Sequence, residues 1–99
     1  MRRALVGTVV AASVSLSSFS AHASDPCETV LCMFGLVQGQ ESSECKNDID
    51  SYFGIVEMHH GHPDIGATAQ SRLSFTQQCK SASSGSISSI DNTFGGVIR

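Results

Sequence analysis

The chain has 99 residues, with six basic and nine acidic side chains and a formal net charge of −3. This length holds one domain at most, which excludes large multidomain enzymes. The acidic balance argues against nucleic acid and against an anionic membrane surface as partners, because both call for a basic patch.

The first 23 residues have the layout of a secretory signal peptide. Two arginines precede an apolar run at residues 4–14, and Ala21-His22-Ala23 has the form of a cleavage site. The run is shorter than the ~20 residues that span a bilayer. We therefore expect cleavage after Ala23, a periplasmic location and no stable membrane span afterwards. The remaining chain, residues 24–99, has four basic residues against nine acidic ones, a formal charge of −5.

Residues 25–35 are predicted to form a first, short helix. Asp25 can serve as its N-cap, Pro26 suits the first helical position, and Glu28 completes a capping box. Gly35 is expected to end the helix. Its apolar residues fall at helical spacing: Cys27, Val30, Leu31 and Phe34.

A second helix is predicted after a polar loop, with Ser42 or Ser43 as its N-cap. Gly61 and Pro63 are expected to close this helix and to form the next turn. The predicted apolar stripe consists of Cys45, Ile49, Tyr52, Phe53 and Val56.

A third helix is predicted from Asp64 to about Cys79. Its apolar arc consists of Ile65, Ala69, Leu73, Phe75 and Cys79. Arg72 lies within that arc, so we expect a buried guanidinium that needs a carboxylate partner. Candidate partners are Glu28, Asp48 and Asp50. An internal ion pair or a snorkelling side chain is favoured over an arginine that binds a partner.

Residues 80–99 contain six serines and three glycines without a sustained helical period. This composition favours a flexible tail that folding does not require, although its few apolar residues leave docking on a partner as an alternative. The predicted fold is therefore all-α. It is a small disulfide-stapled three-helix domain at residues 24–79 with a flexible Ser/Gly-rich C-terminal tail.

Four cysteines follow the predicted signal peptide: Cys27, Cys32, Cys45 and Cys79. An even number in a small exported chain favours structural disulfides over a zinc site or a redox pair. A Cys27–Cys32 bond is disfavoured because the two residues point to different sides of one helix. Of the two remaining pairings we favour Cys32–Cys45 with Cys27–Cys79, because a short loop brings the ends of the first two helices together.

The segment between the second and third helices contains a metal-like cluster: Glu57, His59, His60 and His62. Imidazole suits zinc, copper and nickel, and Met58 can add a soft ligand for copper. Three histidines so close in sequence do not easily converge on one ion. No cofactor is therefore expected, and adventitious binding or none is favoured over a functional metal site.

The string DPCETVLCMFG at residues 25–35 resembles the opening of the TrbM/KikA family of conjugal transfer proteins. Later positions keep that family's order: Ser43-Glu44-Cys45, Tyr52-Phe53-Gly54-Ile55-Val56, His60-Gly61, Pro63, Thr68, Arg72, Phe75 and Cys79. The resemblance covers roughly residues 25–79. It implies a periplasmic accessory protein of plasmid conjugation, associated with mating-pair formation and type IV secretion, and it supplies no catalytic residues.

The expected function is therefore that of a non-enzymatic protein that contacts envelope proteins of the conjugation machinery. A predicted helical core of this size leaves little room for a buried active-site cleft. Two alternatives remain. One is a small periplasmic metal-binding protein that uses the histidine cluster, and the other is an inhibitor or stabiliser of an envelope enzyme.

Overall fold

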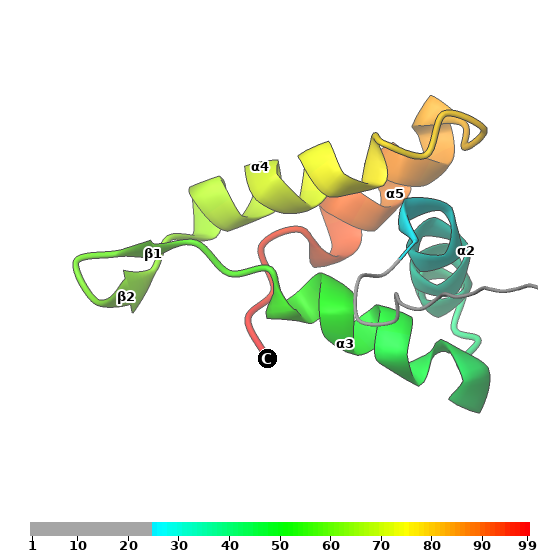
Figure 1. Cartoon of the computed structure of the whole chain (residues 1–99), viewed down its shortest axis with the longest axis horizontal. Coiled ribbons are helices and arrows are strands. Elements are labelled where there is room, and N and C mark those ends of the chain that lie inside the picture. The colour runs from blue at the N-terminus through cyan, green and yellow to red at the C-terminus, as the bar shows by residue number, and fades with distance from the viewer. Residues whose placement is uncertain (1–24) are drawn as a thin grey trace, which may run out of the picture.

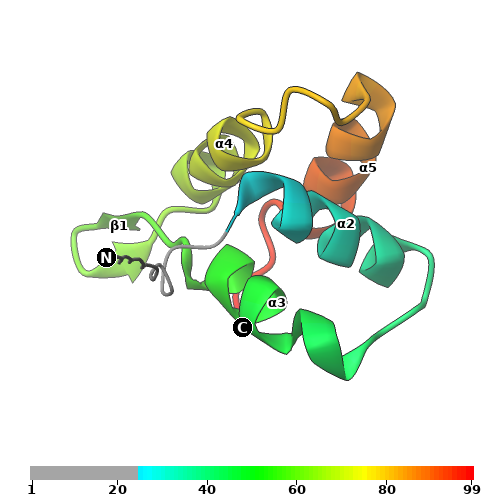
Figure 2. The ribbon, with the colours of Figure 1, turned by 45° about the vertical axis from the view of Figure 1, so that its right-hand side comes forward.

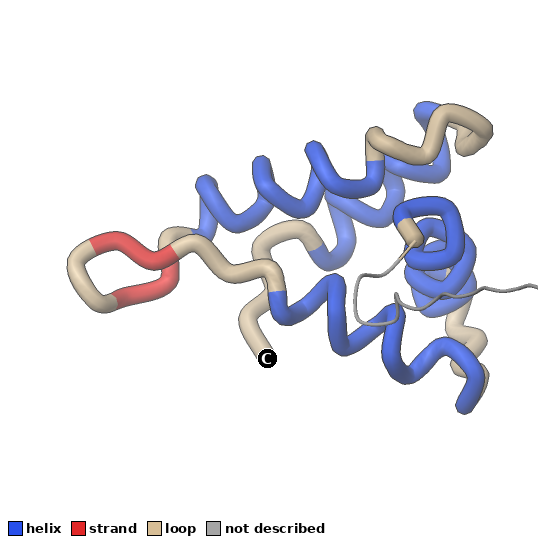
Figure 3. The backbone as a smooth tube through the Cα atoms, viewed as in Figure 1, coloured by secondary structure: helices blue, strands red, loops and turns tan. Residues whose placement is uncertain are grey.

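The computed structural model describes residues 25–99 (Figure 1). The predicted signal peptide and its cleavage site lie outside these described residues. The elements in chain order are α2 (Pro26–Val37), the 3-10 helix η3 (Ser43–Cys45), α3 (Lys46–Gly54), β1 (Met58–His59), β2 (His62–Pro63), α4 (Ile65–Thr76) and α5 (Ser84–Phe94). The predicted all-α class holds only in part, because the chain is mostly helical but also contains a small two-stranded sheet (Figure 3). Within residues 25–99 no helix is both long and apolar enough to cross a membrane.

Helix α2 begins as the sequence predicted and ends slightly later. The Asp25 side chain accepts a hydrogen bond from the backbone N–H of Cys27 at 2.8 Å, and Pro26 occupies the first turn. The helix continues past Gly35 to Val37, because apolar residues follow the glycine and pack on the core. A glycine inside a helix weakens it by only about 1 kcal/mol relative to alanine, which such packing offsets.

Helix α3 is shorter than its predicted apolar stripe. The Ser42 side chain caps the 3-10 helix η3, accepting from the N–H of Glu44 at 3.2 Å, and α3 follows directly. The helix ends at Gly54, and Ile55 is extended (φ −76°, ψ 101°). Val56 therefore lies beyond the helix, and the face toward the core consists of Ile49, Tyr52 and Phe53.

The predicted turn around Gly61 is a β-hairpin with a two-residue loop. His59 pairs with His62, and the loop residues His60 and Gly61 both have positive φ, 53° and 79°. Positive φ at both loop positions is the geometry of type I′ hairpins, whose twist matches that of the strands. The hairpin projects away from the helices in Figure 1, and all its strand residues are exposed.

The buried face of α4 differs from the predicted apolar arc. The fully buried residues are Thr68, Arg72 and Thr76, four residues apart, while Ile65 is 56% exposed. The Asp64 side chain caps the helix by accepting from the N–H of Ala67 at 3.0 Å. The helix ends at Thr76, before Cys79. A polar stripe is thus buried here, and its hydrogen bonds compensate for the lost solvation.

The prediction of a flexible tail at residues 80–99 is wrong, because this segment forms the fourth helix, α5. Ser83 caps it, accepting from the N–H of Ser86 at 3.1 Å. Ile87 and Ile90 lie at i, i+3 and are buried, which places them in the core. Of the serines in this helix, Ser84 and Ser88 are exposed, while Ser86 and Ser89 are half-buried. The fold is therefore a four-helix domain rather than three helices with a tail.

The four helices enclose one core. Helix α2 packs against α3, α4 and α5, and α4 packs against α5. Figures 1 and 2 show α3 and α4 on two sides of the domain with the C-terminal segment passing between them. The buried apolar residues come from α2, α3 and α5 and from the loop after α4. They are Val30, Met33, Ile49, Tyr52, Phe53, Cys79, Ile87 and Ile90.

The contribution of α5 to the core can be tested with Ile90→Ala and the matched surface change Ser88→Ala. Ile90 is 1% exposed, and removing its buried methyl groups should lower the free energy of unfolding by about 2–5 kcal/mol. Ser88 is exposed, so its replacement should change the value by no more than about 0.5 kcal/mol. Urea unfolding of the chain from residue 24 onward measures both, and equal stability of the two variants would contradict the assignment of α5 to the core.

Candidate functional site

Two disulfides connect α2 to the rest of the domain. Cys27 bonds to Cys79 with a Cα–Cα distance of 4.8 Å, and Cys32 bonds to Cys45 with 5.4 Å. This is the pairing favoured from the sequence. The chain-entropy model assigns loops of these lengths roughly 4 and 3 kcal/mol of stabilisation, not strictly additive. Both bonds hold α2 in place, one at its start and one in its middle.

Arg72 has the largest fully buried side chain in the described residues, with 0% exposure. Its Nε donates to the carbonyl of Ile55 at 3.0 Å, and its Nη2 donates to the carbonyl of Phe53 at 3.2 Å. Its Nη1 donates to the carbonyls of Phe94, Gly95 and Val97 at 2.9, 3.1 and 2.7 Å. One guanidinium therefore binds five backbone carbonyls from two separate segments of the chain.

The acceptors of Arg72 explain how its charge is buried without a carboxylate in contact. Phe53 lies at the end of α3 and Phe94 at the end of α5, where helices leave carbonyls without intrahelical partners. Carbonyl groups at these helix ends also carry partial negative charge, which favours a cation. The guanidinium thus satisfies the C-terminal ends of two helices at once.

The carboxylate partners predicted for Arg72 are wrong. Asp48 accepts instead from the Thr29 hydroxyl at 3.3 Å, and Asp50 pairs with exposed Lys46 at 2.8 Å. Glu28 lies exposed on α2. The nearby carboxyl group is that of Asp91, one turn before the end of α5, which acts on Arg72 through its charge rather than through a direct bond. The prediction that Arg72 is buried agrees with the structure, although its buried neighbours on α4 are threonines and not the predicted apolar residues.

Aromatic rings complete the surroundings of Arg72. Its guanidinium carbon lies 5.1 Å from the ring centroid of Tyr52 and 5.2 Å from that of Phe53, within cation–π range. Burial lowers the pKa of Arg72, and the guanidinium stays a cation because arginine does not lose its proton in proteins. Burial also raises the pKa of Tyr52 to about 12, and it raises the pKa of Asp91. These groups were not singled out as a cluster from the sequence.

The candidate metal ligands do not form a site in the structure. His59 and His60 have ring centroids 4.1 Å apart, but they belong to an exposed hairpin. Glu57 accepts a hydrogen bond from Ser71 of α4 at 2.7 Å, which directs it toward that helix. Within residues 25–99 no three histidine, cysteine or carboxylate side chains are close enough together to hold an ion. His62 is the partner of His59 in the register of the hairpin.

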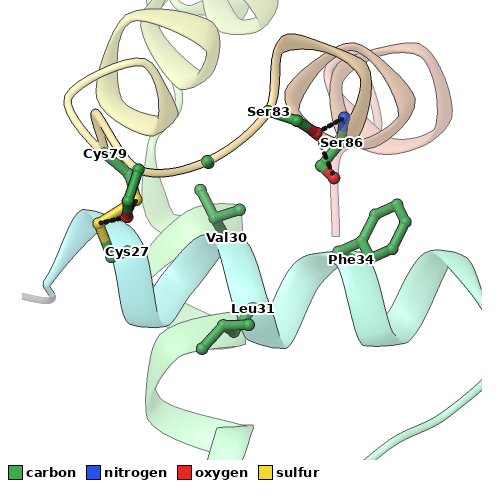
Figure 4. Close-up of a pocket in the computed structure, with 9 residues that line it drawn as sticks. Cys27, Val30, Leu31, Phe34, Cys79, Ser83 and Ser86 are labelled. Carbon is green, nitrogen blue, oxygen red and sulfur yellow. Dashed lines mark hydrogen bonds between the residues drawn. A yellow bond between two sulfur atoms is a disulfide. The ribbon is translucent and has the colours of Figure 1, made fainter.

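An apolar depression of about 320 Å³ lies between α2 and the loop that leads into α5 (Figure 4). In the figure, Val30 points from α2 toward this loop, and Phe34 points toward α5. The full lining consists of Cys27, Val30, Leu31, Phe34, Cys79, Ser81, Ala82, Ser83 and Ser86, none of them charged. This depression was not predicted, because its far wall is formed by residues that the sequence assigned to a flexible tail.

A second depression adjoins the first along α2, and Leu31 lines both. Its lining consists of Glu28, Leu31, Cys32, Glu44, Cys45 and Asp48. Leu31 is 75% exposed, the highest value among the large apolar residues exposed in the described chain. An apolar and an acidic surface therefore meet at one exposed leucine.

The role of Arg72 can be tested with Arg72→Ala, Arg72→Met and the control Arg99→Met. Loss of the guanidinium leaves the carbonyls of Phe53, Ile55, Gly95 and Val97 without a donor, so both Arg72 variants should lose more than about 3 kcal/mol of unfolding free energy. Met should be the milder change because it still fills the space. Arg99 is exposed over the Phe53 ring, and its replacement should cost less than about 1 kcal/mol. Urea unfolding measures all three, and Arg72 variants as stable as the control would contradict the role.

The environment of Tyr52 predicts a loss of stability in alkali. Its pKa is about 12 in the folded chain against 10.0 for a free side chain, so the unfolded state loses its proton first. The contribution of Tyr52 to stability should therefore be constant below pH 10 and should fall as pH rises from 10 to 12. Tyr52 is the only tyrosine and the chain has no tryptophan, so tyrosinate absorbance reports this group alone.

Tyr52→Phe is the matched control for this titration. The Tyr52 hydroxyl is buried without a hydrogen-bond partner among the described residues. Removing it should leave stability at pH 7 unchanged or slightly higher and should abolish the part of the alkaline fall due to this group. A tyrosinate titration near pH 10 in the folded protein would contradict the buried environment.

Comparison with known proteins supports the resemblance seen in the sequence. No curated protein and no solved structure matches the chain. The family model TrbM matches residues 20–94, a range that includes all four helices and both disulfides. The match extends beyond the residues that the resemblance covered and includes α5. The chain therefore belongs to the TrbM family, whose members are related to conjugal transfer.

Proposed function

We propose that this protein is a non-enzymatic periplasmic accessory factor of plasmid conjugation, associated with mating-pair formation and type IV secretion. It acts by binding envelope proteins of the conjugation machinery. The observation that carries the proposal is the TrbM match over residues 20–94, together with the predicted signal peptide at residues 1–23.

The arrangement of the described residues supports a binding role. Arg72 is buried and bonded to backbone carbonyls, so its guanidinium stabilises the fold and does not face a ligand. Two disulfides hold α2 in one position, and an oxidised chain of this kind suits the periplasm. The same helix presents an exposed leucine between an apolar and an acidic depression. A rigid helix with an apolar centre suits protein recognition.

Deletion of the gene from a conjugative plasmid should lower the frequency of transfer to a recipient. The full chain should restore transfer, whereas a version that begins at Ser24 should not, because it lacks the predicted export signal. Intact mass of the periplasmic protein should show cleavage after Ala23. Normal transfer after deletion, or full activity of the version without residues 1–23, would overturn the proposal.

A further inference from the structure

Leu31 is placed on α2 between two chemically different surfaces. At 100° per residue, it lies about 40° around the helix from Cys27, and Glu28 lies about 100° from Cys27 in the same direction. Cys27 lines the apolar depression and Glu28 lines the acidic one. In Figure 4, Leu31 lies on a different flank of α2 from Val30. The leucine is therefore the ridge between the two surfaces.

The apolar depression provides a site for large apolar side chains. Its volume is about 320 Å³, and the Cys27–Cys79 disulfide fixes one end of it. Its walls belong to α2 and to the loop and first turn of α5, which pack against each other. Because both walls are part of the folded domain, the depression is formed before any partner arrives, and binding costs little reorganisation.

The acidic depression sets the charge of the occupant. Glu28 and Glu44 are exposed, and Asp48 is half-buried beside them. No basic side chain lines either depression among the described residues; Lys80 follows Cys79 in sequence but lines neither. Carboxylates without a basic neighbour attract lysine or arginine from a partner and repel an anionic surface.

We propose that α2 is the docking surface for a basic amphipathic helix of a partner protein, with Leu31 at its centre. Apolar residues of that helix enter the depression lined by Val30 and Phe34, and its lysines or arginines lie over Glu28 and Glu44. A second copy of the chain does not fit this description, because pairing the surface with itself brings like charges together. The inference rests on the proposed function and names the chemistry of the partner.

The probe is a synthetic peptide with leucines at i, i+3, i+4 and i+7 and lysines on the flanking positions. Its counterpart carries glutamates in place of the lysines. Titration into isotope-labelled protein from residue 24 onward should shift the amide signals of residues 27–34, 44–48 and 81–86. The glutamate peptide should bind at least about tenfold more weakly, and added salt should weaken only the lysine peptide.

Matched variants locate the contact. Leu31→Ser should weaken binding at least about tenfold, while Met58→Ser, at a position 59% exposed in the hairpin, should stay within about twofold. Glu28→Gln with Glu44→Gln should weaken binding by at least about threefold. Glu41→Gln with Glu57→Gln, which changes the net charge equally outside the surface, should not. Unchanged thermal midpoints show that all variants fold.

Three results would overturn the proposal that α2 is a docking surface. They are equal binding of the two peptides, equal effects of Leu31→Ser and Met58→Ser, and dimerisation through residues 27–34 that Leu31→Ser abolishes. In the transfer assay, a Leu31→Ser chain that fully restores conjugation would also overturn it while leaving the accessory function intact. Loss of transfer with Leu31→Ser but not with Met58→Ser would support it. Normal transfer after deletion of the gene would instead overturn the accessory function, regardless of how the two peptides bind.

Discussion

The burial of Arg72 is the constraint on which the rest of the fold depends. A guanidinium with no exposure needs several acceptors, and here all of them are backbone carbonyls. They lie at the ends of α3 and α5 and in the segments that follow each helix. One side chain of α4 therefore binds the C-terminal ends of two other helices. The position of the C-terminal segment follows from the same contact.

Close packing supports this arrangement at the C-terminal segment. A Cβ atom at Gly96 would lie 2.7 Å from Cγ2 of Ile65, so only glycine lets the chain pass the start of α4 at this distance. Phe94 packs edge-to-face against Phe53, with ring centroids 5.7 Å apart. The chain after α5 thus lies against both α3 and α4, and its carbonyls are brought to Arg72.

The disulfides and the arginine act on different parts of the domain. Cys27–Cys79 and Cys32–Cys45 tie α2 to the loop before α5 and to the start of α3. Arg72 joins the opposite ends of α3 and α5. Helix α2 is consequently held without contributing to the arginine cluster. Its outer side, around Leu31, remains available for a partner.

The sequence by itself determined the starts of α2 and α4, the mostly helical class and the family, because capping residues, apolar spacing and cysteine positions are local features. Asp25, Ser42 and Asp64 all cap as their side chains predict. Only the tertiary structure decided that residues 80–99 contain a helix and which groups bind Arg72. Two buried isoleucines on α5 outweigh its serine-rich composition once the core is present. The acceptors of Arg72 are backbone carbonyls, which every residue carries, so no side-chain pattern indicated them.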